Sequence, residues 1–267
     1  MSTPLTDAIT SLTTYANGVT GASDTTLSDA VRTLADGYGQ GGGWSVEDIE
    51  AGAPDGDVVS TGTSIRGNAY AGSNITSYVN NVVSMPYGMG VQDRAFNSCV
   101  ELKTVSMPKL QKMSNYVFTG CTAMTKLSVP LLYSIGNYSL QNCKALTAIA
   151  LPKLTTAISY LAQNCTALEV ADLGSCPAIN TSSFQGCTAL RTLVLRRTAG
   201  VCTCSWNNHL GGIYSNPTAS TIYVPSALIS AYQSASGWSS AYAAGVTFAQ
   251  IEGSIYETKD ANGEDLQ

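Results

Sequence analysis

The stretch RAFNSCVELKTVSMP, residues 94–108, returns in modified form as YVFTGCTAMTKLSVP, residues 116–130. Both stretches contain a phenylalanine, a cysteine three positions later, and then apolar residues that lead to a proline. Five cysteines recur at the same 22-residue interval: Cys99, Cys121, Cys143, Cys165 and Cys187. Self-similarity at a fixed period of this length indicates a repeat solenoid.

A short strand in each unit is predicted by the apolar residues that alternate before the proline. In the first of these stretches, Val105 and Met107 would face the core, and Pro108 would end the strand. The rest of the unit is expected to turn back, with a short helical or 3₁₀ turn around residues 115–121. One unit cannot bury its own apolar face, but stacked units pair their strands in parallel about 4.8 Å apart. The sequence therefore predicts a repeat solenoid with short parallel β-strands and a 22-residue period over residues 65–250.

The first turn of the solenoid is expected to be degenerate, as terminal repeats usually are. Val83, Met85 and Pro86 keep the register of the strand and the proline, and Ser77 falls where a cysteine is expected.

The five cysteines are predicted to form a column of buried free thiols. Cysteine is small, apolar and often buried, and parallel neighbours keep their Cβ atoms about 4.8 Å apart, whereas a disulfide prefers roughly 3.8 Å. His209, the only histidine, lies one further interval after Cys187 and is interpreted as the end of this column. Two alternatives stay open, a zinc site with Cys202 and Cys204 and a Cys–His nucleophile, although neither matches a standard spacing.

The repeated unit resembles the BspA-like leucine-rich repeat, a bacterial family in which AF-x-x-C-x-x-L-x-x-V-x-L-P is the recurring core. The two stretches at residues 94–108 and 116–130 match this core closely. The resemblance covers residues 90–200 firmly and extends weakly to about residue 250. It implies a curved solenoid with a parallel sheet, and it implies binding rather than catalysis, often to host proteins or cell surfaces. No cofactor is expected.

The regions outside the repeat divide the chain further. Residues 1–40 predict two short amphipathic helices, which cannot form a stable core alone and are interpreted as an anchor, with packing on the solenoid as the alternative. Residues 41–64 are interpreted as a Gly-rich hinge and lead-in. Residues 226–236 predict a cap helix with Ser226 as its N-cap and Gly237 as its stop. Residues 251–267 are expected to form a polar tail.

The composition argues against several function classes. Charged residues make up 12% of the chain, the net charge is −5, and no Lys/Arg-rich run exists, so a nucleic-acid binder is not expected. No apolar stretch is long enough for membrane insertion. The acidic residues are scattered, and no phosphate loop or catalytic triad pattern is visible, so the chain is not expected to be an enzyme.

A ligand is expected to contact outward-facing strand residues, although a merely solvated face is the simpler interpretation. Loop tyrosines that recur near the start of each unit are an alternative, and packing of their rings explains them equally well. The candidate strand residues are Lys103, Thr104, Ser106, Lys126, Ser128, Glu169, Asp172, Arg191 and Thr192, and the tyrosines are Tyr116, Tyr133, Tyr138 and Tyr160.

Two biological settings compete for this binding module. The segment DTTLSDAVRTLADGYGQGGG, residues 24–43, resembles the openings of prophage and bacteriophage virion proteins. With free thiols and no export signal, this favours a virion protein (tail, fibre or capsid surface) assembled in the host cytoplasm. Its partners would be other virion proteins through the N-terminal segment, and a bacterial surface protein or glycan through the solenoid. Multiple copies are expected in such an assembly. The alternative is a bacterial cell-surface adhesin.

Overall fold

The computed structural model describes residues 55–60, 64–80, 90–205 and 207–266. The predicted anchor at residues 1–40 lies outside the described residues, as do most of the hinge and Val83, Met85 and Pro86.

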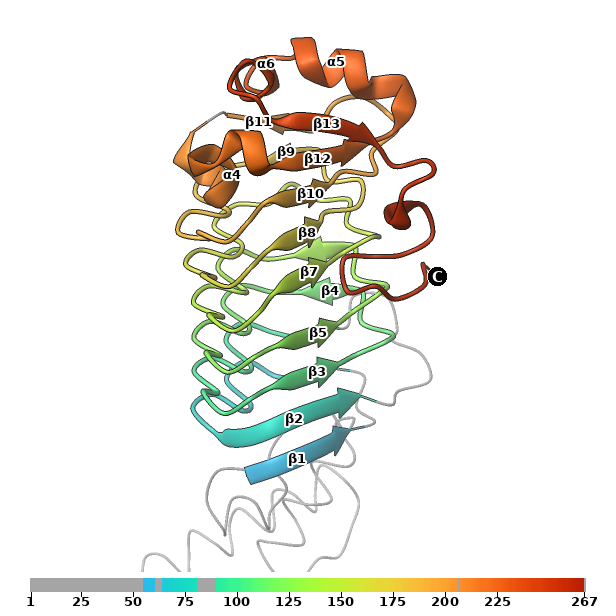
Figure 1. The fold of residues 1–267 in the computed structure, drawn as a ribbon. Helices are drawn as coiled ribbons and strands as arrows, with labels where there is room; N and C mark the ends of the chain where they lie inside the picture. The colour runs from blue at the N-terminus through green and yellow to red at the C-terminus, as the bar shows by residue number, and fades with distance from the viewer. Residues whose placement is uncertain (1–54, 61–63, 81–89, 206, 267) are drawn as a thin grey trace, which may run out of the picture.

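One long ladder of parallel strands runs along the solenoid and confirms the predicted fold class (Figure 1). It divides into a four-stranded and a five-stranded sheet, with a break between β5 and β7. Successive strands pair at the 22-residue spacing through the middle units, for example Thr104 with Lys126 and Val170 with Thr192. In order, its strands are β1 (Asp55–Ser60), β2 (Asn74–Asn80), β3 (Thr104–Ser106), β5 (Lys126–Ser128), β7 (Ala148–Ala150), β8 (Val170–Asp172), β10 (Thr192–Val194), β12 (Thr221–Val224) and β13 (Thr247–Gln250).

A second series of short parallel strands forms the opposite wall and was not predicted. It consists of the pair β4 (Lys112–Met113) and β6 (Ser134–Ile135) and the pair β9 (Ala178–Ile179) and β11 (Thr203–Cys204), each extended by isolated bridges such as Val91 with Met113 and Ile158 with Ile179. The expected helical or 3₁₀ turn around residues 115–121 is instead a series of hydrogen-bonded turns over residues 115–120. The middle strands also begin one residue earlier than predicted, so that each ends two residues before its proline.

The column cysteines lie in the core between the two walls. All five are free and 0% exposed. Each thiol donates a hydrogen bond to a carbonyl of the preceding unit, as Cys121 does to Phe96 at 3.1 Å and Cys165 does to Leu140 at 2.9 Å. Next to this column, the rings of Phe96 and Phe118 stack with their centroids 5.0 Å apart. The cysteine therefore connects neighbouring units as well as filling space.

The first unit is in a different register from the predicted one. The Cys99 thiol donates to the Tyr70 carbonyl, and the Ser73 hydroxyl lies 3.6 Å from Cys99 Sγ. Ser73 thus occupies the cysteine position, whereas Ser77 lies in β2 opposite Thr104. These two strand partners lie further apart in the sequence than one 22-residue period, because the connection after β2 is longer than in the later units. Because of this extra length, counting back 22 residues from Cys99 arrives at Ser77 instead of Ser73.

His209 does not continue the cysteine column, so that prediction is wrong. In a regular unit, the Phe96 N–H donates to the carbonyl of Val117, the residue before the next aromatic position. Phe184 makes the same bond to the carbonyl of His209, which places Leu210 at the aromatic position. Inserted residues ahead of His209 therefore shift the register, and its side chain is only partly buried.

The C-terminal end of the solenoid is covered by β12, β13 and short helices. These helices are η1 (Asn208–Leu210), α4 (Gly212–Ser215), η2 (Pro217–Ala219), η3 (Ser226–Leu228), α5 (Ile229–Ser234) and α6 (Trp238–Ala243). The predicted cap helix is present as η3 and α5, but Ser226 makes no side-chain cap, and its N–H donates to Glu252 Oε2 at 2.9 Å. Tyr232 and Trp238 are buried against the core beneath. Among the described residues, none of these helices is long and apolar enough to span a membrane.

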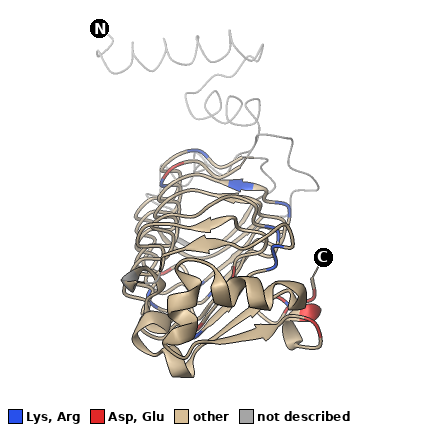
Figure 2. Ribbon diagram, turned by 90° about the horizontal axis from the view of Figure 1, so that it is seen from above, with Lys and Arg blue, Asp and Glu red and all other residues tan. Residues whose placement is uncertain are grey.

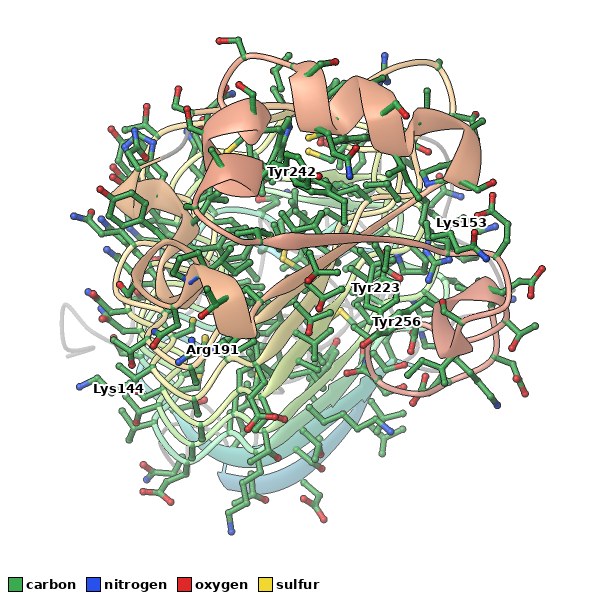
Figure 3. The ribbon with its side chains drawn as sticks, turned by 45° about the horizontal axis from the view of Figure 1, so that its top comes forward. Lys144, Lys153, Arg191, Tyr223, Tyr242 and Tyr256 are labelled. Carbon is green, nitrogen blue, oxygen red and sulfur yellow. The ribbon has the colours of Figure 1, made fainter. Side chains whose placement is uncertain are left out.

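Residues 251–266 do not extend into solvent as a polar tail. They pass through η4 (Ile255–Glu257) and return beside β12, β10 and β8 (Figure 1). Ile251 and Tyr256 form a second apolar cluster with Val194, and Tyr223 packs against it (Figure 3). The Tyr223 and Tyr256 rings meet edge to face at 4.8 Å. The outward face of the C-terminal strands is therefore covered by the chain itself.

Candidate functional site

The predicted ligand-facing strand residues do not form one continuous exposed surface. Lys103, Thr104, Lys126 and Glu169 are exposed, whereas Ser106, Ser128, Arg191 and Thr192 are partly buried and Asp172 is fully buried. Arg191 Nη1 donates to the carbonyls of Thr188 and Leu190 in its own turn, and its side chain lies apart from the Tyr223–Tyr256 contact (Figure 3). The outward face thus remains open mainly in the N-terminal half of the ladder.

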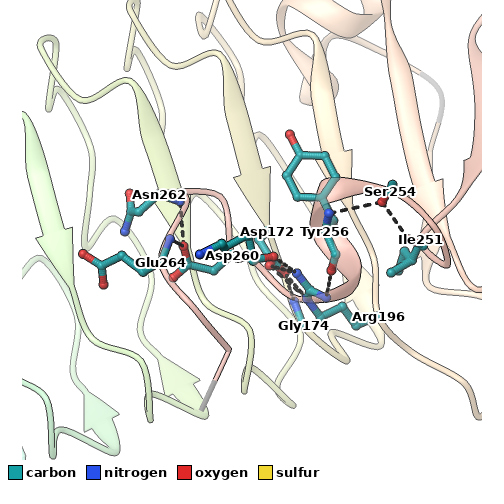
Figure 4. A network of polar contacts seen from close by, with 10 residues as sticks. Asp172, Gly174, Arg196, Ile251, Ser254, Tyr256, Asp260, Asn262 and Glu264 are labelled. Carbon is teal, nitrogen blue, oxygen red and sulfur yellow. Dashed lines mark hydrogen bonds and ion pairs between the residues drawn. The ribbon is translucent and has the colours of Figure 1, made fainter.

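Asp172 is part of a buried ion pair rather than a ligand-facing position. Its carboxylate accepts hydrogen bonds from Arg196 Nε at 2.9 Å and Nη2 at 2.6 Å, and from the Gly174 N–H at 3.1 Å (Figure 4). Burial raises the pKa of Asp172, and the Arg196 guanidinium opposes that rise. Arg196 in turn donates to the carbonyls of Tyr256 and Lys259. The pair therefore holds the C-terminal segment against the strands.

A departure from the repeat pattern in the sequence marks the place of this ion pair. Proline follows the strand in three successive units, but Gly174 and Arg196 occupy that position in the next two. Gly174 has φ +51°, and a Cβ there would lie 2.7 Å from the carbonyl oxygens of Leu151 and Pro152. The two departures from proline coincide with the place where the C-terminal segment docks.

The loop tyrosines form a stacked column at the surface. The rings of Tyr116 and Tyr138 are 4.9 Å apart with an interplanar angle of 5°, and those of Tyr138 and Tyr160 are 4.6 Å apart at 15°. The guanidinium of Arg94 lies 4.8 Å from the Tyr116 ring and covers the first face of the column. All three tyrosines remain partly exposed. Tyr133 lies outside this column, with Lys112 Nζ 5.6 Å above its ring.

The backbone beneath this tyrosine column (Arg94, Tyr116, Tyr138 and Tyr160) is strained. Tyr116, Tyr138 and Tyr160 have φ between +52° and +60°, a region that bulky residues seldom adopt. The left-handed conformation costs about 1–2 kcal/mol per residue, so three tyrosines cost roughly 3–6 kcal/mol. Two stacked ring pairs return roughly 1–3 kcal/mol. Four residues further on, the same conformation is occupied by Gly120, Asn142 and Asn164, residue types that tolerate it better. The equivalent residues Arg94 and Ser182 have φ +59° and +52°, so the turn of each unit imposes this conformation, and stacking offsets only part of what tyrosine costs there.

Polar side chains flank the tyrosine column in ladders of their own. Gln141 donates to Gln163 at 2.9 Å, and Gln163 donates to Gln185 at 2.8 Å. In addition, the Asn137 N–H donates to Asn115 Oδ1 at 2.9 Å. Partial desolvation raises the pKa of Tyr138, so its phenol remains protonated at neutral pH. The surface thus offers aromatic edges, hydroxyl groups and amides in a regular array.

The geometry around Cys202, Cys204 and His209 does not make a metal centre. Within the parts of the chain that the structure describes, no three His, Cys, Asp or Glu side chains are grouped to hold a metal ion. Cys202 is buried, and its N–H donates to the Tyr232 hydroxyl while its carbonyl accepts from Trp238 Nε1. Burial raises the pKa of Cys204 to about 12, which disfavours a reactive thiolate. These contacts join the cap to the last full unit.

Comparisons with solved structures find leucine-rich repeat proteins. A leucine-rich repeat protein from T. pallidum is 18% identical over 54% of this chain and 67% of that chain, with a TM-score of 0.43. One from Bacteroides ovatus is 21% identical over 51% of this chain and 37% of that chain, with a TM-score of 0.43. A leucine-rich cell surface protein from Faecalibacterium prausnitzii is 12% identical over 67% of this chain and 65% of that chain, with a TM-score of 0.40. This chain therefore spans less than two thirds of the length of the second and third of these proteins.

The comparison with protein families identifies the repeat itself. A search of curated proteins returns no match. The BspA type leucine rich repeat region matches residues 63–191 in six copies, across the units that carry the cysteine column and the tyrosine column. Residues 63–191 of this chain therefore belong to the BspA-type leucine-rich repeats.

Proposed function

We propose that this chain is a non-catalytic recognition module that binds a protein on another surface through the tyrosine column. The observation that carries the proposal is the stacked column of three partly exposed tyrosines, placed at positive φ where smaller or more tolerant residues would be less strained. Backbone strain that the local packing does not repay is characteristic of functional positions. The family to which the repeat belongs is one of interaction modules, which supports the same class of function.

A protein partner fits the column better than a glycan does. Sugar rings bind tyrosine by stacking on the ring face, but both faces of Tyr138 are covered by Tyr116 and Tyr160. The ring edges, hydroxyl groups and flanking amides remain for contact. Tyrosine and asparagine are common in protein-binding surfaces because they give contact area and hydrogen bonds at a low entropic cost.

The exposed residues at the open part of the strand ladder are a second candidate contact surface for the same partner. Thr104 on β3, Lys103 just before it and Glu169 just before β8 are exposed, and we retain them as candidate contact residues. No large apolar patch accompanies them among the described residues, so we expect modest affinity for each copy and useful avidity from display in several copies.

The setting in which the module is displayed is a separate proposal. We favour display on a bacterial surface, because that is what the BspA-type repeat implies. Attachment to a virion through residues 1–40 rests on a sequence resemblance alone. Antibody labelling would distinguish display on bacteria from display on a virion. Antibodies against the chain should label intact bacteria, whereas labelling confined to purified phage particles would favour the virion.

Adhesion of protein-coated beads tests the recognition role. Beads carrying the full chain should bind cells from a panel of bacteria, and pretreating the cells with protease should abolish binding while periodate oxidation of glycans should not. Tyr138→Asn should reduce binding at least tenfold. The matched control is Tyr133→Asn, which removes a partly exposed tyrosine outside the column and should bind as the wild type does. Equal binding by both variants would contradict the assignment of the column, and periodate-sensitive binding would contradict a protein partner.

A further inference from the structure

The break in the long strand ladder coincides with the C-terminal segment. On the β3 side, backbone groups of Lys126 and Ser128 make the ladder hydrogen bonds. Because alternate residues of a strand bond to opposite neighbours, the Leu127 carbonyl faces β7, with which β5 forms no ladder. This carbonyl accepts a hydrogen bond from Asn262 Nδ2 at 3.2 Å. The C-terminal segment therefore uses a backbone acceptor that the interrupted sheet leaves available.

Side chains near this acceptor bind an acidic side chain and a backbone carbonyl of the C-terminal segment. Lys126 Nζ lies 2.7 Å from Glu264 Oε1, and the Ser128 hydroxyl donates to Glu264 Oε2 at 3.3 Å. Further along the ladder, Arg196 donates to the Lys259 carbonyl at 2.9 Å while Asp172 fixes its guanidinium (Figure 4). Lys126, Leu127, Ser128 and Arg196 thus form a preorganised surface, the β5 docking surface.

The segment that occupies the β5 docking surface is a self-contained hairpin. Asp260 Oδ1 accepts from the N–H groups of Asn262 and Glu264, and the Leu266 N–H donates to the Thr258 carbonyl. Within residues 258–266, Asp260 alone is buried, so the hairpin contributes no side chain to an apolar core. By contrast, Ile251 and Tyr256 are buried in the second apolar cluster. The contacts that hold the hairpin to the solenoid are therefore mainly polar.

The ion pair among these contacts is weak because it is exposed, whereas the Arg196 guanidinium is only 14% exposed. The Lys126 and Glu264 side chains are 52% and 39% exposed, and ion pairs at such exposure contribute little to stability. The charge is nevertheless complementary: residues 251–267 contain five acidic residues and one lysine, which is most of the chain's net charge of −5. Figure 2 shows these acidic residues gathered near the C-terminus.

We propose that the β5 docking surface binds an acidic segment of a partner protein and that the hairpin of residues 258–266 is an intramolecular competitor for it. Three of the contacts that hold the hairpin would accept any segment of suitable shape, because Arg196 and Leu127 bond to backbone or amide groups and Lys126 to a carboxylate. The segment that fits carries a carboxylate five residues after the carbonyl bound by Arg196, as Glu264 follows Lys259. This surface is distinct from the tyrosine column, so the two proposals stand or fall separately.

Peptide binding to the full chain tests the competition. The probe is a synthetic peptide of residues 256–267, labelled for fluorescence anisotropy. The wild-type chain should bind it weakly, because the tethered hairpin competes at a millimolar effective concentration. A full chain carrying Asn262→Ala and Glu264→Gln, which releases the hairpin, should bind it at least tenfold more tightly, and added salt should weaken that binding.

Matched controls make the outcome specific. A peptide with Asp260→Asn and Glu264→Gln should lose binding to the released chain, and Lys126→Glu in that chain should lose binding of the original peptide. A peptide with Glu264→Lys should regain binding to the Lys126→Glu chain, which shows that a folded surface was tested. Tyr138→Asn should leave all of these affinities unchanged.

If the released chain binds no more tightly than the wild type, or binds charged and neutral peptides equally, the hairpin is a structural strap and the proposal is overturned. Dimers of the wild type that dissociate on release of the hairpin would overturn it in favour of a second copy as the partner.

Discussion

The thiol of Cys143 donates a hydrogen bond to the carbonyl of Phe118, 25 residues earlier, with Sγ 3.2 Å from the oxygen. The same carbonyl accepts the N–H of Cys121 from its own unit at 3.1 Å. One carbonyl therefore connects two turns of the solenoid, and its second acceptor site is filled by a side chain that is small enough for the core. This explains why cysteine, and not alanine, recurs at 22-residue spacing.

Removal of one thiol should destabilise the solenoid measurably. Cys143→Ala deletes the hydrogen bond to Phe118 and leaves a small cavity, so we expect a loss of about 1–3 kcal/mol in the free energy of unfolding. Cys143→Ser keeps a donor but buries a more polar group with a shorter reach, and its loss should fall in the same range. Urea unfolding monitored by circular dichroism gives both values. Unchanged stability of Cys143→Ala would show that the thiol contributes packing volume at most.

Burial of the thiols predicts a dependence of stability on pH above neutrality. Burial raises the pKa of Cys143, whereas an unfolded thiol ionises near pH 8.5. Above that pH the unfolded chain loses a proton that the folded chain keeps, so the contribution of Cys143 to stability falls as pH rises. The stability difference between wild type and Cys143→Ala should therefore shrink by about 1.4 kcal/mol per pH unit above pH 8.5. Alkylation of the folded chain at pH 9 should stay slow; a difference that is constant with pH would contradict a buried neutral thiol.

The repeat could be predicted from the sequence because every middle unit has the same length. Val105, Leu127 and Ile149 recur at the interval that pairs their strands, and all three are buried. The same regularity failed at both ends, where insertions shift Ser73 into the cysteine position and His209 away from it. A fixed period carries no information on where such insertions fall.

The second wall and the C-terminal segment could not be predicted for a different reason. The strands of the second wall, such as Lys112–Met113, are two residues long and too short to show alternation. Residues 251–267 look polar in composition, and their docking depends on Arg196 and Lys126, which lie far away in the chain. The stacking of Tyr116 on Tyr138 follows from the period, but the positive φ of both residues depends on turn geometry that a single sequence does not reveal.

Loss of Arg196 should destabilise the chain strongly. Asp172 is 0% exposed, and Arg196→Met leaves its carboxylate buried without its cationic partner, at a cost of about 3–5 kcal/mol. Adding Asp172→Asn removes the charge but keeps an acceptor for the Gly174 N–H, so the double variant should regain most of the loss. Thermal unfolding at neutral pH measures both effects.

The Arg196→Met variant should also respond to acid. Burial raises the pKa of Asp172, so without the guanidinium the folded state binds a proton more readily than the unfolded state does. Stability of the variant should consequently increase as pH falls from 7 toward 5, relative to the double variant, which lacks this carboxyl group. Parallel stability curves for the two variants would show that Asp172 does not become protonated in the folded state.

Tyr138→Asn should separate the stability of the tyrosine column from its function. The substitution loses two stacked ring pairs, worth roughly 1–3 kcal/mol together, and relieves about 1 kcal/mol of strain because asparagine tolerates φ near +60°. We therefore expect a net destabilisation of no more than about 2 kcal/mol, measured by urea unfolding, and a folded chain at room temperature. Asn142→Gly, at the neighbouring left-handed position of the same turn, provides the matched backbone control and should leave both stability and adhesion close to those of the wild type. If Tyr138→Asn keeps full adhesion while losing stability, the column serves packing only; if it loses adhesion while remaining folded, the Tyr138 side chain is required for recognition.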